Sequence, residues 1–160
     1  MREREALIRQ LHGEPSHKHI LHSLEGLDAA QAGRLVGQSP HSIFQVLGHM
    51  QYWLDITLHR LAGRPQRPAA AALGWTTPAA PRDGEWLEAV AKFGERLQVL
   101  ATRILDPKLD LDTIVQPESG VRAREEILMI QGHNSYHLGQ IVMLRQELGC
   151  WPPPRGGDTW

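Results

Sequence analysis

The chain has 160 residues, 41% of them hydrophobic and 22% charged, which is enough to bury one core and leaves little room for a second domain. The formal net charge of −1 lacks the basic excess typical of nucleic-acid-binding proteins, and no run of about 20 apolar residues could span a membrane. A single cysteine, Cys150, and an N-terminus without a signal-peptide pattern predict one cytoplasmic domain over residues 1–160.

Apolar residues recur at three- and four-residue spacing in four stretches, which predicts an all-α fold, a four-helix bundle. The predicted helices cover about residues 3–24, 42–62, 85–105 and 122–148. The first contains a candidate break at residues 13–15, where a glycine and a proline lie close together. Strand signals are weak throughout the chain.

The ends of these helices carry recognisable signals. Ser39, followed by a proline, is the expected cap of the second helix, Asp83 that of the third, and Gly149 ends the fourth. About 20 residues, 63–83, join the second helix to the third, which is long for a loop in a compact domain. We therefore expect a crossover between two helices that are not simple antiparallel neighbours. Residues 106–120 form another connection, in which two prolines and a glycine disfavour helix.

A pair of histidines in the fourth helix is the main candidate for chemistry. In QGHNSYHLGQIVMLRQ, His133 and His137 lie four residues apart, on the same side of the helix as Ile130 and Ile141. Two imidazoles in this position can clamp one metal ion, and His49 of the second helix could supply a third ligand. Spacing alone leaves a second interpretation open, in which these histidines are hydrogen-bonded within the core.

Several other residues have two interpretations each. Gln140 could orient a ligand ring or be an ordinary polar residue at a helix boundary. Four neighbours of the histidines could line a substrate pocket or simply belong to the core: Tyr52, Trp53, Asn134 and Tyr136. His17, His19 and His22 could form another metal site, although solvated side chains are the simpler interpretation.

A general base is missing from the pattern. The chain has no HExxH motif, and Asp55, the acidic residue nearest to His49 in sequence, points away from it on a helical wheel. Cys150 has no neighbouring histidine or lysine to activate it, so we interpret it as a small buried hydrophobic residue. The residues alone therefore identify no catalytic group.

Three separated blocks of sequence resemble one known family. HNSYHLGQI resembles the HxxxHxGQ signature of the DinB-like (DinB/YfiT) superfamily, HSIFQVLGHMQYWLD resembles its second-helix segment, and WPPPRGGDTW is similar to its proline-rich tail. The resemblance implies an up-down-down-up bundle with the long crossover between helices 2 and 3. It also implies a metal centre with His49, His133 and His137 as ligands, and a homodimer.

The resemblance suggests two chemistries for a metal-dependent enzyme acting on a small molecule. One is hydrolysis of an amide or ester, and the other is transfer or isomerisation with a low-molecular-weight thiol. The expected cofactor is one divalent transition metal, with zinc favoured because it suits a thiolate, and nickel or iron as alternatives. The alternative function is a non-catalytic metal-binding module for stress response or interaction, and a bundle without any metal is a third.

Overall fold

A computed structural model describes residues 2–14, 16–64, 74–75 and 77–156. Within these residues lie six helices and one short antiparallel hairpin: α1 (Arg2–Leu11), α2 (Ile20–Leu24), α3 (Ala29–Gly33), α4 (Ile43–Leu61), α5 (Glu85–Leu105), β1 (Ile114–Gln116), β2 (Val121–Arg122) and α6 (Ala123–Glu147). The expected all-α fold class is confirmed. The hairpin is a small addition that the weak strand signals did not predict.

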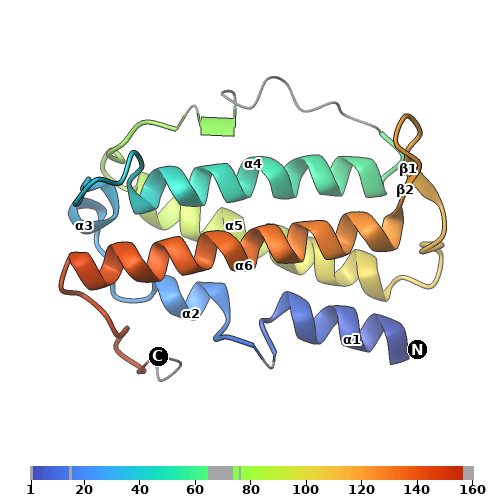
Figure 1. Ribbon diagram of the computed structural model, residues 1–160, viewed down its shortest axis with the longest axis horizontal. Helices are drawn as coiled ribbons and strands as arrows, with labels where there is room; N and C mark the ends of the chain where they lie inside the picture. Colours follow the sequence, from blue (N-terminus) through green and yellow to red (C-terminus); the bar gives the residue numbers. More distant parts are fainter. Residues whose placement is uncertain (1, 15, 65–73, 76, 157–160) are drawn as a thin grey trace.

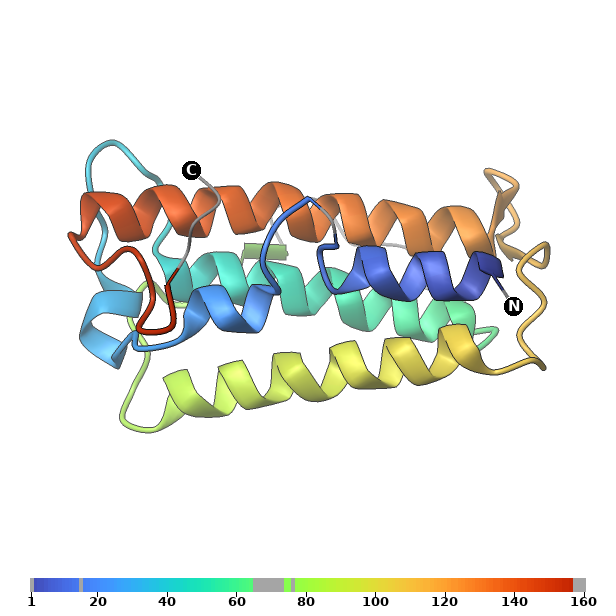
Figure 2. The same ribbon diagram turned by 90° about the horizontal axis from the view of Figure 1, so that it is seen from below.

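The long helices lie side by side, and their directions follow from the colours in Figures 1 and 2. α4 and α5 run the same way, whereas α1, α2 and α6 run the opposite way. α4 packs against both α5 and α6, and α1 and α2 pack against the same two helices from the other side. Because α4 ends and α5 begins at opposite ends of the bundle, the chain must cross its full length between them. Much of the predicted crossover, residues 65–73 and 76, lies outside the described residues.

Buried apolar side chains from all six helices form one core. Met50 and Leu54 of α4 and Ile127 and Ile141 of α6 belong to this core, and all four are fully buried. Burying such side chains is the main force that pairs α4 with α6. Among the described residues, no helix combines the length and the apolar character that crossing a membrane requires.

The start of α4 differs from the expectation in its capping residue. Ser42, not Ser39, caps the helix: its hydroxyl accepts a hydrogen bond from the Gln45 backbone N–H, and the Gln45 side chain accepts one from the Ser42 N–H. This reciprocal pair is a capping box, which satisfies two N–H groups that the helix itself cannot. The Ser39 hydroxyl instead donates to the His41 carbonyl at 2.8 Å. In α5 the N-cap is Gly84, so the expectation of Asp83 was also wrong.

The N-terminal segment breaks at Gly13, within the predicted break, but its second helix is shorter than predicted. Residues 3–24 do not form one helix but two, α1 and α2, separated by turns. Gly13 adopts φ +89°, and a Cβ atom there would lie 2.6 Å from the His17 carbonyl oxygen, so the chain turns where only glycine fits. A third short helix, α3, was not predicted; Asp28 and Gln31 form its capping box.

A buried ion pair joins α4, α6 and the hairpin. The Glu126 carboxylate is fully buried, and it accepts hydrogen bonds from Arg60 at 3.0 and 3.1 Å and from the Thr57 hydroxyl at 2.9 Å. Gln116, at the end of β1, donates to the same carboxylate. These hydrogen bonds to Glu126 therefore join the C-terminal end of α4 and the N-terminal end of α6 to β1, which precedes α6.

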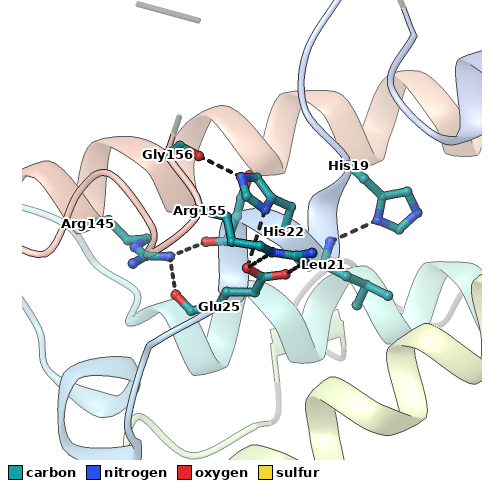
Figure 3. A network of polar contacts seen from close by, with 8 residues as sticks. His19, Leu21, His22, Glu25, Arg145, Arg155 and Gly156 are labelled. Atoms are coloured by element: carbon teal, nitrogen blue, oxygen red, sulfur yellow. Dashed lines mark hydrogen bonds and ion pairs between the residues drawn. The ribbon is translucent and has the colours of Figure 1, made fainter. Parts of the chain in front are cut away.

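The C-terminal tail is held against α2 by polar contacts (Figure 3). Arg145 is buried and donates to the carbonyls of Ser23 at 2.6 Å, Glu25 at 3.0 Å and Cys150 at 2.7 Å. Arg155 of the tail forms an ion pair with Glu25. These contacts fix residues that follow Gly149, whose φ of +69° ends α6 as predicted.

Candidate metal centre

Three histidines from two helices meet between α4 and α6. His49 lies in the middle of α4, and His133 and His137 lie one turn apart on α6. His49 and His137 are buried, with 8% and 4% of their surface exposed, and His133 is half-buried. The helix pair that forms the centre of the core therefore also positions the three rings.

The ring nitrogens are close enough to share one ion. The Nε2 atom of His133 lies 3.2 Å from Nε2 of His49 and 3.1 Å from Nε2 of His137. One nitrogen from each ring lies within 4.8 Å of the other two. In a tetrahedral site with metal–nitrogen bonds of about 2.0–2.1 Å, ligand nitrogens are about 3.3 Å apart. The rings thus have nearly the spacing that a single transition metal needs.

Hydrogen bonds on the outer sides of two rings determine where their protons lie. His49 Nδ1 is 3.0 Å from the Gly74 carbonyl oxygen, and His137 Nδ1 is 2.7 Å from Gln140 Oε1. Both oxygens can only accept, so each Nδ1 carries a proton and each Nε2 directs a lone pair toward the centre. Metal-binding histidines are typically held by such outer hydrogen bonds. Three nitrogens this close need a shared proton or a cation between them, so the donor set fits a metal ion.

The electrostatics also favour a cation over protonated rings. Burial lowers the pKa of all three histidines, and for His133 the pKa falls to about 4, with repulsion from His137 and His49 adding to burial. The rings are therefore neutral at pH 7 and available as ligands. His133 Nδ1 is buried, and the neighbouring Asn134 side chain is the polar group that acts on this ring, partly offsetting the lowering of its pKa.

The connection between α4 and α5 contributes to the centre through Gly74 and Trp75. The Trp75 indole stacks on His49 with ring centroids 3.9 Å apart, and His41 stacks on the same indole at 3.8 Å. Neither Gly74, Trp75 nor His41 was predicted to take part. The available signal was the length of the connection, since loops of this length are often functional, together with an aromatic residue inside it.

The predicted neighbours of the histidines lie at different distances from the centre. Gln140 contacts His137 directly, and Trp53 packs its ring 6.3 Å from His49 and 5.9 Å from His133. Tyr136 is exposed but lies edge-on to His137 at 5.0 Å, and its hydroxyl accepts a hydrogen bond from Gln140.

The remaining two neighbours are Asn134, beside His133 on α6, and Tyr52, next to Trp53 on α4. Asn134 is buried, and its side-chain amide has no hydrogen-bond partner among the described residues. Tyr52 packs against Trp53 at 5.7 Å. A groove of about 510 Å³ beside the centre is lined in part by Tyr136 and Gln140.

The other candidates from the sequence lie apart from the three histidines. Asp55 forms an ion pair with Arg96 of α5, which agrees with its expected direction away from His49. His17 hydrogen-bonds Ser135 at 2.8 Å, His19 caps the Leu21 N–H, and His22 contacts the Gly156 carbonyl. In the part of the chain that the structure describes, His49, His133 and His137 are the one group of potential ligands that converges.

Comparison with known proteins agrees with the motifs and the fold. A family model described as the DinB superfamily matches residues 14–141, a range that includes all three histidines. No curated protein and no solved structure matches the chain. Since the family match covers most of the sequence, the chain belongs to the DinB superfamily.

Proposed function

We propose that this protein is a metal-dependent enzyme whose one divalent transition ion is held by His49, His133 and His137. The main support is the position of three neutral imidazoles whose Nε2 atoms are separated by 3.1 and 3.2 Å, with two lone pairs fixed by outer hydrogen bonds. Zinc is the expected ion because nitrogen ligands at tetrahedral spacing suit it, with nickel and iron as alternatives.

Three protein ligands are the number found in catalytic sites, where a bound ion keeps an open position and acts as a Lewis acid. The residues of this chain then have supporting roles. The Gly74 carbonyl and Gln140 hold the protons on the outer nitrogens, which keeps both inner lone pairs available. Trp53 and Trp75 cover the rings with apolar surface, which limits the access of water and strengthens electrostatic interactions at the centre.

The reaction we propose is either hydrolysis of a small amide or ester, or transfer from a low-molecular-weight thiol. No carboxylate joins the three histidines within the described residues, so acid–base help from the protein is small and the ion carries most of the chemistry. In the first, water would add to the carbonyl carbon and the amine or alcohol would leave. In the second, the thiol sulfur would bond to an electrophilic carbon of the substrate and displace that carbon's leaving group.

The test is to assay untagged protein, purified without chelator, against a panel of small esters and amides and against electrophiles with added thiol. We expect about one transition metal per chain by elemental analysis, and activity that chelation removes and metal restores. Protein that contains one metal per chain but is inactive with both panels would support the non-catalytic module instead. Protein without metal would contradict the proposal altogether.

Lowering the pH is expected to weaken metal binding only when the pH falls below the usual pKa of histidine. A histidine whose pKa is lowered remains neutral to lower pH, so protons begin to compete with the metal later than they would at free imidazoles. Affinity should be nearly constant from pH 8 to 7 and should fall as the pH drops below about 6.5 toward 4. Competition with a chromogenic chelator measures this, and a steep loss of affinity already above pH 7 would contradict it.

Replacing Gln140 by leucine is expected to reduce metal affinity by about 10- to 100-fold, because His137 loses the acceptor that fixes its proton on Nδ1. The matched control is Gln140→Glu, which keeps an acceptor oxygen and should bind metal at least as well as the wild type. Chelator competition at pH 7.5 compares the two variants. Equal affinity in Gln140→Leu and wild type would show that this hydrogen bond does not support the site.

A further inference from the structure

A cleft lined by arginines lies between the last two turns of α4 and the second half of α5, and its volume is about 560 Å³. We call it the arginine cleft. Its lining includes Asp55, Leu58, Arg64, Arg96, Val99 and Arg103. Three of these side chains carry a positive charge and one carries a negative charge, so the lining favours an anion.

The arginine cleft is separate from the metal centre. Asp55 lies six residues after His49, about 9 Å further along α4. The Asp55 side chain pairs with Arg96 of α5, whereas His49 meets the two histidines of α6. None of the three candidate metal ligands is among the described residues that line the cleft. The charges of the cleft therefore need an explanation other than the metal.

Two of the three arginines have unused hydrogen-bond donors. Arg96 donates to Asp55 through Nε, and its two terminal nitrogens donate to no described residue. Arg64 gives its backbone N–H to the His59 carbonyl, but its side chain forms no ion pair or hydrogen bond with any described residue. A guanidinium with free N–H groups is well suited to hold an oxyanion through two parallel hydrogen bonds.

The third arginine of the cleft is only partly satisfied by the protein. Arg103 donates to the Asp106 carboxylate and to the Leu61 carbonyl, each at 3.1 Å. Its Nε is buried and has no hydrogen-bond partner within the part of the chain that the structure describes. Buried donors are normally paired. An anion bound in the cleft can supply the acceptor after a small rotation of the Arg103 side chain.

The sequence that follows Asp55 supplies no acidic side chain to neutralise these arginines. Residues 56–82 contain four arginines and neither aspartate nor glutamate, although the whole chain has a net charge of −1. One of the four, Arg60, is paired with Glu126, whereas Arg64 pairs with no described residue. Positive charge is therefore concentrated in this stretch of the chain, and the residues that join α4 to α5 before Arg82 carry no carboxylate for the cleft.

We propose that the arginine cleft binds a small molecule that carries a phosphate group. Arg64 follows α4 and Arg96 belongs to α5, so an anion held by both needs oxygens that point in different directions. A tetrahedral phosphate has such oxygens, whereas a carboxylate has only two, in one plane. Leu58 and Val99 give apolar surface for the organic part. The volume of the cleft suits a small molecule, and the net charge of the chain disfavours long polyanions.

The first experiment titrates the full chain, purified without chelator, with phenyl phosphate in a calorimeter. We expect one site per chain, with affinity that falls as salt is added. Inorganic phosphate should bind more weakly because it has no group to pack on Leu58 and Val99, and benzoate more weakly because it has no tetrahedral anion. No binding of phenyl phosphate at about 10 mM, or equal affinity for benzoate, would overturn the proposal.

Two variants test the arginines with unused donors. Arg64→Gln and Arg96→Gln should each weaken the binding of phenyl phosphate about tenfold or more, because each removes charged hydrogen bonds to the anion. Arg64 is exposed, so its replacement leaves the packing of the bundle intact. The matched control is Arg82→Gln, which removes the same charge from an exposed pair with Glu85 outside the cleft and should bind normally. Equal affinity in all three variants would contradict the proposal.

Two further measurements separate the arginine cleft from other places where a phosphate can bind. The His133→Ala protein, which lacks a candidate metal ligand, should bind phenyl phosphate with wild-type affinity. Loss of binding in this variant, with normal binding in Arg64→Gln, would place the anion at the metal centre and overturn the proposal. A short oligothymidylate that binds more tightly than phenyl phosphate would instead indicate a nucleic-acid surface, which would also overturn it.

Discussion

The His133→Ala protein is expected to contain no transition metal while keeping its helical fold. The Nε2 atom of His133 lies 3.2 Å from that of His49 and 3.1 Å from that of His137. Without His133, only two ligands remain, one on α4 and one on α6. Two imidazoles hold a divalent ion far more weakly than three, and we expect affinity to fall by about three orders of magnitude or more.

The matched control for His133→Ala is His59→Ala, which removes a half-buried histidine from the same chain but outside the cluster. Elemental analysis after purification without chelator should find about one metal per chain in wild type and control, and none in His133→Ala. Circular dichroism should show the same helix content in all three. Equal metal content in wild type and His133→Ala would mean that any bound ion is held elsewhere.

Replacing Arg60 by alanine is expected to lower the free energy of unfolding by about 3–5 kcal/mol, because the fully buried Glu126 carboxylate loses its opposite charge. Urea unfolding, followed by circular dichroism, measures this. The control is Arg96→Ala, which breaks the more exposed pair with Asp55 and should cost less than about 1 kcal/mol.

A second variant checks the cause of that destabilisation. Glu126→Gln in the Arg60→Ala background removes the unpaired charge but keeps an oxygen that can accept from the Thr57 hydroxyl. We expect this double variant to recover part of the lost stability. If Arg60→Ala proves no more harmful than Arg96→Ala, the buried pair is not what fastens α6 to α4.

The parts of the fold that local pattern determines were predictable from the sequence. α5 begins and ends where its apolar spacing predicts, and α6 differs by one residue at each end. His133 and His137 could be placed on one face because helix geometry alone fixes residues four apart. In residues 3–24 the break at Gly13 was predicted, but the helix after it is shorter than the apolar spacing suggests and covers only Ile20–Leu24.

The surroundings of the histidines depend on contacts between distant residues, which a single sequence does not reveal. Trp75 reaches His49 from the connection between α4 and α5, where the sequence has no apolar periodicity that would indicate its position. The capping of α4 by Ser42 was missed in favour of Ser39 because both serines are plausible caps and only the hydrogen bond to Gln45 distinguishes them. Glu126 reads as a first-turn acidic residue, and only the packed structure places it beside Arg60.

The most direct test of the metal centre is X-ray diffraction from crystals of the metal-loaded protein, with anomalous data collected at the absorption edge of the bound ion. The result we expect is one ion between α4 and α6, bonded to Nε2 of His49, His133 and His137 at about 2.0–2.1 Å and open on its remaining side. An ion bound only at the histidines that precede or lie in α2, or one sealed by a fourth protein ligand, would contradict a three-histidine catalytic site.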